Sequence, residues 1–335
     1  MGNLKNMKLV MAGLIFYVVV LVLSMNWWGL QILNGYFMVI INRSLVFVML
    51  AVSLNLINGI TGQFSLGHMG FAAVGAYVSG TFTTLLFHLN PHHPLDSLGF
   101  LAAIIVGGLV ASLAGFLIGF PSLRLKGDYL AIVTLGFGEI IRTILNNIPY
   151  VGGPRGLLGI PKFSNFTVIF LFTFATIVLI RNLVQSSIGR SMLSIRENEL
   201  ASELVGVNTT RYKVLGFVVG AFFAGIGGGL LAHLLQIAHP TQYGFYASAL
   251  ILIMVYVGGI GSLTGSIIAA FSLTFLTEGL RVGIDWLRDT VGIPIGTEWT
   301  MVIYAVLLIL IMLFKTEGLM GMRESKLLII KEKQG

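Results

Sequence analysis

The sequence has no cysteine and very little charge. The absence of cysteine excludes disulfide bonds, thiolate metal sites and a cysteine nucleophile. Asp, Glu, Lys and Arg together make up 10% of the 335 residues, against about 25% in soluble domains. So few charges could not cover the surface of a water-soluble protein of this length. They also exclude a disordered chain and a nucleic-acid-binding chain.

Motifs of enzymes that handle phosphates, metals or acyl groups are also missing. The sequence has no P-loop, no HExxH, no GxSxG and no paired acidic motif. The glycine run at 225–229 superficially resembles a phosphate loop, but it lies inside an apolar segment, where close helix packing is the favoured interpretation. We therefore expect a protein that is no enzyme, holds no metal or cofactor, and draws any energy from outside this chain.

Apolar residues fill the space that charge leaves, and they make up 56% of the chain. A helix that crosses a bilayer needs about 20 apolar residues, whereas β-barrel strands alternate apolar and polar residues and lack such runs. Ten apolar segments of the helical kind lie near 9–25, 36–57, 64–87, 98–120, 129–148, 166–184, 214–235, 246–260, 262–282 and 299–315. This predicts an all-α polytopic membrane protein of ten transmembrane helices, with the boundaries at 58–63 and 258–263 least sharply marked.

The positions of the basic residues predict the orientation. Of the 20 Lys and Arg residues, 14 fall in segments that are cytoplasmic if the N-terminus is inside, four fall outside, and Arg43 and Arg142 lie within spans. This bias follows the positive-inside rule and predicts that both termini are cytoplasmic. Bulky residues at 25–28 replace the small residues of a cleavage site, so we expect the first span to be retained. The chain, 1–335, then forms one transmembrane domain with a cytoplasmic tail at 316–335.

Polar residues concentrate between the second and third spans. Amides, hydroxyls, glycines and an imidazole occur together in 55–68, and polar, glycine-broken backbone at membrane depth is tolerated where protein or a water-filled cavity satisfies it. Asn55, Gln63, Ser65 and His68 therefore qualify as the lining of a translocation path. A short cytoplasmic turn with packing glycines explains the same residues equally well.

Glu139, Arg142 and Arg43 are charged residues that lie within predicted spans. Glu139 and Arg142 are three residues apart and share one helical face, where mutual neutralisation offsets a cost of about 2.5–3.5 kcal/mol for each charge at the bilayer centre. The pair fits a pathway element or a structural ion pair near the outer interface. Arg43 has no acid nearby in the sequence, so its partner is expected on another helix or among lipid headgroups.

Two hydrophilic segments present helical patterns. In the inner loop 185–213, Ser194 and Glu197 fit a capping box, an apolar stripe follows, and Gly206 ends the predicted helix at 194–206. This helix suits docking to a soluble partner or a position on the membrane surface. On the outer side, helical spacing relates the charged residues Glu278, Arg281, Asp285 and Arg288. They indicate either a face for an extracytoplasmic partner or an interfacial helix.

Four separated stretches carry a family resemblance. They are 55–71 (NLINGITGQFSLGHMGF), 123–145 (LRLKGDYLAIVTLGFGEIIRTIL), 152–161 (GGPRGLLGIP) and 196–229 (RENELASELVGVNTTRYKVLGFVVGAFFAGIGGG). In these stretches and in its span order the chain resembles the LivM-type permease subunits of branched-chain amino-acid ABC importers, over nearly its whole length. The resemblance implies a type II-like importer fold in the cell (inner, cytoplasmic) membrane.

The resemblance also implies partners and a mechanism. The partners are a LivH-type homologous permease, two cytoplasmic ATPase subunits that bind ATP and Mg²⁺, and an extracytoplasmic solute-binding protein. ATP hydrolysis would drive alternating access of a path between the two permeases. The 194–206 helix looks like the coupling helix that contacts an ATPase, through Arg196, Glu199, Ala201, Glu203 and Gly206. Importers generally carry an EAA-then-Gly pattern here, of which this chain retains only the small residues.

Two alternatives stay open on the sequence. A self-contained secondary transporter or channel for a small polar solute would need ion-coupling acids within its spans, and only Glu139 and Glu278 qualify. Within the family, related permeases move other amino acids, urea or short-chain amides, and the binding protein chiefly sets the choice.

Overall fold

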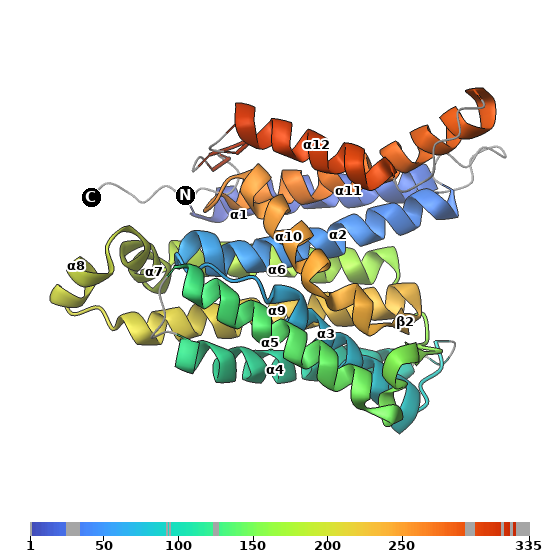
Figure 1. The fold of residues 1–335 in the computed structure, drawn as a ribbon, viewed down its shortest axis with the longest axis horizontal. Coiled ribbons are helices and arrows are strands. Elements are labelled where there is room, and N and C mark those ends of the chain that lie inside the picture. The colour runs from blue at the N-terminus through green and yellow to red at the C-terminus, as the bar shows by residue number, and fades with distance from the viewer. Residues whose placement is uncertain are drawn as a thin grey trace.

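The structure is a computed structural model that describes residues 2–24, 34–91, 93, 95–122, 127–291, 299–315, 318–321 and 324–325. Helices dominate it, and most of them run along the long axis of the molecule (Figure 1). The α-helices are α1 (Gly2–Ser24), α2 (Gly35–Asn55), α3 (His68–Thr81), α4 (Asp96–Ser122), α5 (Asp128–Asn147), α6 (Phe166–Gln185), α7 (Ser187–Glu197), α8 (Glu199–Leu204), α9 (Thr209–Leu235), α10 (Phe245–Gly258), α11 (Leu263–Trp286) and α12 (Trp299–Phe314).

Short π-helical turns extend three of these helices. They are η1 (Leu56–Ile60) after α2, η2 (Phe82–Leu86) after α3 and η6 (Leu287–Val291) after α11. The 3₁₀ turns η3 (Pro149–Val151), η4 (Gly153–Arg155) and η5 (Pro240–Tyr243) lie in the connections around α5 and α10. Two strands of two residues each, β1 (Leu157–Leu158) and β2 (Ile237–Ala238), pair antiparallel and join the α5–α6 connection to the α9–α10 connection.

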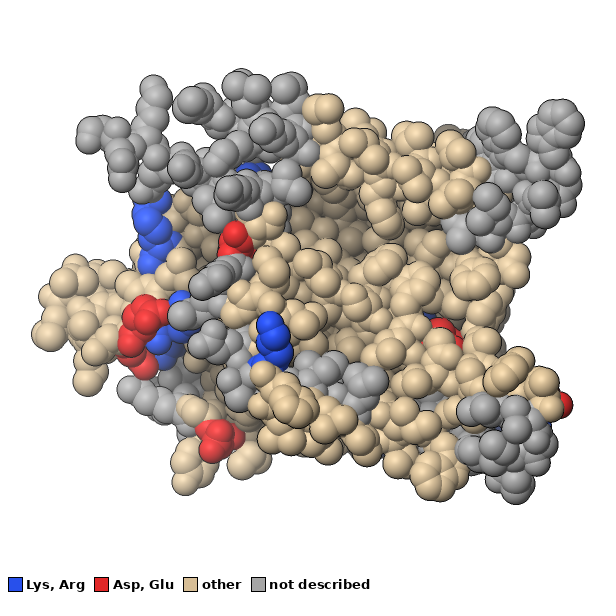
Figure 2. Space-filling view, turned by 90° about the horizontal axis from the view of Figure 1, so that it is seen from above, with Lys and Arg blue, Asp and Glu red and all other residues tan. Residues whose placement is uncertain are grey.

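The helices are apolar enough to confirm an all-α polytopic membrane protein. Within the described residues, seven helical segments are long and apolar enough to cross a membrane: Gly35–Ile60, His68–Leu86, Asp96–Phe120, Phe166–Gln185, Thr209–Leu235, Pro240–Gly258 and Leu263–Thr290. The other three predicted spans coincide with α1, α5 and α12. Most charged side chains visible in Figure 2 lie toward the end that carries α7 and α8, and uncharged residues cover the length of the bundle.

Glycines let α9 pack closely between α3 and α4. A Cβ on Gly225 would lie 2.5 Å from the Cβ of Ala111 on α4, and one on Gly228 would overlap the backbone of Ala72 on α3. Any larger residue at either position would push two helix backbones apart. The glycine run at 225–229 therefore serves helix packing, as the sequence indicated.

Two predicted boundaries are wrong. The third helix begins at His68 rather than at residue 64, because 61–67 form an irregular segment. The single helix expected at 194–206 is two helices, α7 and α8, that meet at Asn198. Ser194 lies inside α7, where its hydroxyl donates to the Ser191 carbonyl, so it caps nothing. The division predicted near 258–263 is present, with Gly259 and Gly261 at φ of 113° and 87°, values that favour glycine.

Candidate functional site

Asn55 joins the end of α2 to the start of α11. Its amide nitrogen donates to the Ser262 carbonyl at 2.8 Å and to the Ser266 hydroxyl at 2.9 Å. Its amide oxygen accepts from the Gly261 N–H at 2.9 Å. The side chain is fully buried and engaged at both ends. The structure thus shows that Asn55 holds the end of α2 against the start of α11.

The irregular segment 61–67 carries buried polar groups that have no hydrogen-bond partner among the described residues. Gln63 is 3% exposed and Ser65 is fully buried. Neither the Gln63 amide nor the Ser65 hydroxyl forms a hydrogen bond within the described part of the chain. Burying such a group unpaired costs about 1–3 kcal/mol, so native proteins seldom retain one without a reason. The backbone of the segment is better satisfied, because the Leu66 N–H donates to the Thr134 hydroxyl of α5 at 3.0 Å.

His68 lies at the first position of α3 and connects that helix to α2. Its Nε2 lies 2.8 Å from the Ser53 hydroxyl, and the ring packs edge-on against Phe71 with 6.2 Å between centroids. The side chain is fully buried. Asn55, Gln63, Ser65 and His68 therefore all lie in or beside the break between α2 and α3.

Glu139 and Arg142 form the expected ion pair, but this pair lies away from residues 55–68. Arg142 Nε donates to Glu139 Oε2 at 2.7 Å, and the two side chains are 36% and 30% exposed. Glu139 Oε1 also accepts from the backbone N–H of Phe245, the first residue of α10, at 2.9 Å. Asn55 contacts the chain just beyond the other end of α10. A helix of 14 residues is about 20 Å long, so the structure does not bring the pair and the 55–68 group together.

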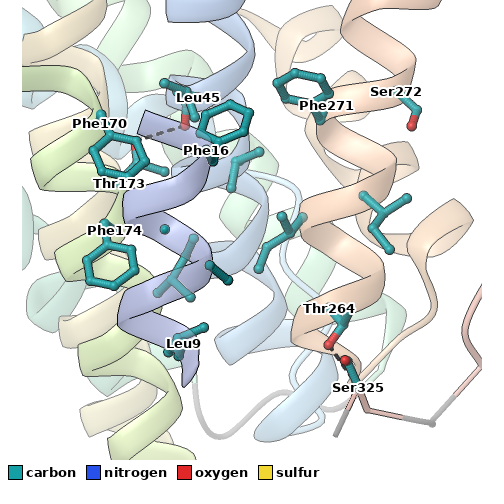
Figure 3. Close-up of a pocket in the computed structure, with 16 residues that line it drawn as sticks. Leu9, Phe16, Leu45, Phe170, Thr173, Phe174, Thr264, Phe271, Ser272 and Ser325 are labelled. Atoms are coloured by element: carbon teal, nitrogen blue, oxygen red, sulfur yellow. Dashed lines mark hydrogen bonds between the residues drawn. The ribbon is translucent and has the colours of Figure 1, made fainter. Parts of the chain in front are cut away.

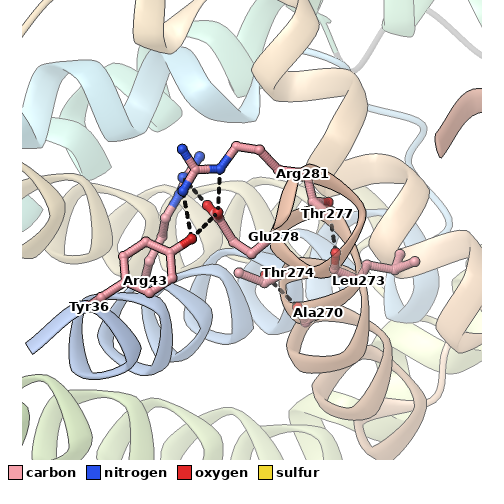
Figure 4. Close-up of polar contacts among 8 residues, drawn as sticks. All are labelled: Tyr36, Arg43, Ala270, Leu273, Thr274, Thr277, Glu278 and Arg281. Atoms are coloured by element: carbon pink, nitrogen blue, oxygen red, sulfur yellow. Dashed lines mark hydrogen bonds and ion pairs between the residues drawn. The ribbon is translucent and has the colours of Figure 1, made fainter. Parts of the chain in front are cut away.

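The acid that Arg43 needs comes from α11. Arg43 Nη1 lies 3.5 Å from Glu278 Oε1, while Glu278 Oε2 accepts from Arg281 Nε and from the Tyr36 hydroxyl, each at 3.0 Å (Figure 4). Arg43 also lies over the Phe47 ring at 5.3 Å from the centroid. The expectation of a partner on another helix is confirmed. Glu278 and Arg281, predicted to face an outside partner, face α2 in this cluster.

A cavity of about 370 Å³ adjoins this cluster. Its lining residues are Arg43, Phe47, Tyr246, Leu250, Met254, Thr274, Thr277, Glu278, Arg281 and Tyr304. Beyond it, Asp285 and Arg288 stay on the surface, where Arg288 Nη2 lies 3.3 Å from Asp285 Oδ1. Their side chains are 38% and 45% exposed, which leaves them accessible to a partner.

A second cavity, of about 410 Å³, lies between α1, α6 and α11 (Figure 3). Phe16, Phe170, Phe174 and Phe271 are among its lining side chains, with Thr264 and Ser325 at one end. None of its lining residues is charged. The cavity therefore offers no counter-charge for the ammonium or carboxylate group of an amino acid, and the residue patterns in the sequence gave no sign of it.

The projecting end of the molecule exposes apolar side chains on α8. Asn198 is its N-cap and accepts from the Ala201 N–H at 3.0 Å. Leu200, Leu204 and Val205 are 68%, 89% and 79% exposed. Exposed apolar side chains grouped in this way mark a surface that contacts another protein or the membrane.

The polar residues of this loop are mostly engaged within the chain. Glu199 forms an ion pair with Lys213 of α9, and Glu203 accepts from the Thr209 hydroxyl at 2.7 Å. Gly206 ends α8 with φ of 87°, as the sequence indicated. Arg196 is directed into the bundle, where its Nη1 donates to the Gly59 carbonyl at 2.8 Å.

Sequence reasoning missed one residue at this end of the bundle. Glu324 accepts hydrogen bonds from the backbone N–H groups of Leu263 and Thr264 and, at 2.6 Å, from the Thr264 hydroxyl. It therefore caps the first turn of α11. Its partners lie about 60 residues earlier in the chain, so no local pattern marks it. Across the described residues, no group of three His, Asp or Glu side chains is placed to hold a metal ion.

Comparisons with known proteins match the chain to one family. Residues 36–312 match the family described as "Branched-chain amino acid transport system / permease component". The chain is 34% identical to the high-affinity branched-chain amino acid transport system permease protein LivM of Escherichia coli (strain K12), across 93% of this chain and 76% of that protein. It is 35% identical to the LivM protein of Salmonella typhimurium, across 86% and 71%.

More distant similarity extends to a second kind of permease. The chain is 24% identical to the permease protein LivH of Salmonella typhimurium, across 88% of this chain and 96% of that protein. No solved structure matches the chain.

Proposed function

Since the chain belongs to the family of branched-chain amino acid transport permease components, we propose that it is a membrane-spanning subunit of an ABC importer, and that together with a homologous permease it forms the path for branched-chain or related amino acids. The LivM and LivH relatives from Salmonella typhimurium are both named as permease proteins of a high-affinity branched-chain amino acid transport system, which supports pairing with a LivH-type subunit. Two cytoplasmic ATPases supply the energy, and an extracytoplasmic binding protein delivers the substrate. The chain itself carries no ATP site.

The structural observation that carries this proposal is the exposed α8. Leu204 and Val205 at the end of α8 are 89% and 79% exposed. In water this surface is unfavourable, so it is best explained by a groove on a soluble partner that covers it. An ATPase subunit is the partner that a permease of an ABC importer requires on its cytoplasmic side.

The same assignment sets the orientation. If α8 is cytoplasmic, then the chain crosses the inner membrane ten times, through α1 to α6 and α9 to α12, and both termini are cytoplasmic. The short connections at Gly259–Ser262 and around Asn55–His68 then lie toward the cytoplasm. The α5–α6 and α9–α10 connections, which β1 and β2 join, lie on the outer side with Glu139, Glu278, Asp285 and Arg288.

Within this frame the candidate residues take distinct roles. Gln63, Ser65 and His68, with Asn55 holding their surroundings, form the inner part of the path. Glu139 and Arg142, about one-third exposed, lie toward its outer part. The outer residues of η6 and of the end of α11, Asp285 and Arg288 foremost, meet the binding protein.

Reconstitution tests the function directly. The purified complex of both permeases and both ATPases is placed in proteoliposomes with internal or external ATP as its orientation requires, and uptake of radiolabelled leucine is measured with the loaded binding protein. Uptake that requires ATP, the binding protein and this chain is expected. Leucine uptake by proteoliposomes that contain this chain alone would instead indicate a self-contained transporter and overturn the proposal.

A further inference from the structure

Two glycine turns meet at the inner end of the bundle. The first, residues 59–62, connects α2 and η1 to the segment before α3, and the second, residues 259–261, connects α10 to α11. They touch backbone to backbone, because a Cβ on Gly59 would lie 2.8 Å from the Gly261 Cα. Gly62 and Gly261 both have positive φ, at 68° and 87°. The contact therefore joins the connection between α2 and α3 to the connection between α10 and α11, and a side chain on Gly59 would block it.

Arg196 of α7 lies against both turns. Its Nη1 donates to the Gly59 carbonyl at 2.8 Å. A Cβ on Gly261 would lie 2.6 Å from the same nitrogen, and one on Gly62 would lie 2.9 Å from Arg196 Cγ. The Arg196 side chain is only 21% exposed. The guanidinium therefore occupies the space that the absent glycine side chains leave.

The other edge of the guanidinium is attached to α7 itself. Arg196 Nε and Nη2 donate to Glu197 Oε1 at 3.1 and 2.6 Å. Glu197 is the last residue of α7, and α8 begins two residues later. Because a guanidinium is planar and presents its donors in a fixed fork, it transmits a displacement of the α7–α8 junction to the Gly59 carbonyl.

We propose that Arg196 is a positioning residue that links the ATPase-docking helix α8 to the two glycine turns. When an ATPase displaces α8, Arg196 moves the first turn, and the backbone contact between Gly59 and Gly261 carries the movement to the second. Helices α2, α3, α10 and α11 then shift at their inner ends together. This inference rests on the proposed function. It places the Arg196 side chain against the glycine turns inside the bundle and not on the surface that contacts the ATPase.

The test uses the whole importer complex in proteoliposomes and compares three variants of this chain. Arg196→Gln removes the charged fork but keeps a polar side chain. Arg190→Gln is the matched control, because it removes the same charge from an exposed position of the same helix. Glu197→Ala frees the outer edge of the guanidinium by removing a side chain that is itself 69% exposed.

Leucine uptake and ATP hydrolysis are measured together. For Arg196→Gln, ATP hydrolysis is expected to continue while leucine transported per ATP falls about tenfold, the factor expected when one hydrogen bond to a charged group is lost. Glu197→Ala is expected to lower the ratio less, and Arg190→Gln to leave it unchanged. An unchanged ratio in Arg196→Gln overturns the inference. If that variant fails to assemble, Glu197→Ala decides, and a wild-type ratio there also overturns it.

A labelling measurement shows whether Arg196 transmits the movement of α8 to the glycine turns or only stabilises those turns. The chain has no cysteine, and Ile260 in the second turn is 37% exposed, so Ile260→Cys gives this chain one accessible thiol. With partners free of cysteine, its maleimide reaction rate is expected to change when ATP and vanadate trap the complex, and Arg196→Gln is expected to abolish that change. A rate change that persists in Arg196→Gln contradicts the inference. A wild-type complex that transports no leucine contradicts the proposed function instead.

Discussion

The Glu139 carboxylate on α5 accepts a hydrogen bond from the backbone N–H of Phe245 at the start of α10, at 2.9 Å. The residue before Phe245 is Gly244, which has no side chain to cap the helix. Glu139 therefore provides the acceptor that the helix otherwise lacks. An anion at a helix N-terminus is also favoured by the helix dipole. Glu139 therefore stabilises two helices. It pairs with Arg142 on α5, and it caps the start of α10.

We expect Glu139→Ala to lower the free energy of unfolding by about 1–2 kcal/mol, the usual cost of a lost N-cap and a lost charge at a helix end. Thermal unfolding of the purified protein in detergent measures this. Glu139→Gln is the control, because its amide oxygen can still accept from Phe245 and only the charge is lost. The cap is contradicted if both variants unfold at the same temperature as the wild type.

Replacing Gln63 by Leu is expected to separate stability from transport. The Gln63 amide is buried with no protein partner in the described residues, so an apolar side chain of similar size removes an unpaired polar group and should leave the free energy of unfolding unchanged or raise it by about 1 kcal/mol. If Gln63 borders the path, leucine uptake by the complex should nevertheless fall.

Two measurements therefore decide the role of Gln63. Thermal unfolding reports on stability, and uptake per complex reports on the path. Ser65→Ala, which removes a buried hydroxyl with no hydrogen-bond partner in the described part of the chain, serves as a second variant with the same expectation. Wild-type uptake in both variants would show that this break is a structural turn, which is the alternative interpretation of the sequence.

The break itself illustrates what the sequence could and could not predict. Periodicity and apolar length found the helices, because a bilayer demands long apolar runs. The grouping of Asn55 with His68 followed from their closeness in the chain. The partners of Asn55 are more than 200 residues away, and no local pattern encodes a contact over that separation. The same holds for Arg43 and Glu278, since the sequence showed that Arg43 needed an acid but not which one.

The helices between α6 and α9 differ from the prediction for another reason. Ser194 and Glu197 match a capping box by residue type, but Asn198 is a stronger candidate for the same role, and its side chain does cap α8. Which of two neighbouring residues caps a helix depends on how α7 packs against the bundle. Local residue preferences carry no information about that packing. The family resemblance placed Arg196 at the ATPase contact, whereas its Nη1 donates to the Gly59 carbonyl, 137 residues earlier in the chain, a contact that no local pattern encodes.

An acidic residue in place of Leu204 is expected to weaken ATPase binding. Leu204 is 89% exposed, so the change Leu204→Glu leaves the fold of this chain unaffected, but it puts a charge where an apolar groove is expected, at a cost of about 2 kcal/mol or more in binding. Co-purification of the ATPase with the permeases measures the loss. Thr210→Glu adds the same charge to an exposed position at the start of α9 and should bind normally. Equal binding in the two variants would rule out docking through α8.

Charge reversal at Glu199 is expected to uncouple transport, and the structure shows how to restore it. Glu199→Lys places two cations side by side, because Glu199 is paired with Lys213 of α9. The exchanged pair Glu199→Lys with Lys213→Glu restores the attraction and should recover leucine uptake. If Glu199 contacts the ATPase directly, as the family resemblance implies, the exchanged pair stays inactive. Survival of both ATPase association and uptake in the single variant would remove Glu199 from the coupling surface, and Glu203→Lys tests the neighbouring position in the same way.

The cap that Glu324 provides is expected to control opening of the first turn of α11. Glu324→Ala leaves the N–H groups of Leu263 and Thr264 without their acceptor, at a cost of about 1–2 kcal/mol in local stability. That cost corresponds to amide hydrogen exchange about tenfold faster in the peptide that begins at Leu263. The start of α9, where Asn208 is the cap, provides the internal control and should exchange as in the wild type. Glu324→Gln should lie between the two, because its amide can accept one of the bonds. Unchanged exchange at Leu263 in Glu324→Ala would show that Glu324 does not stabilise the first turn of α11.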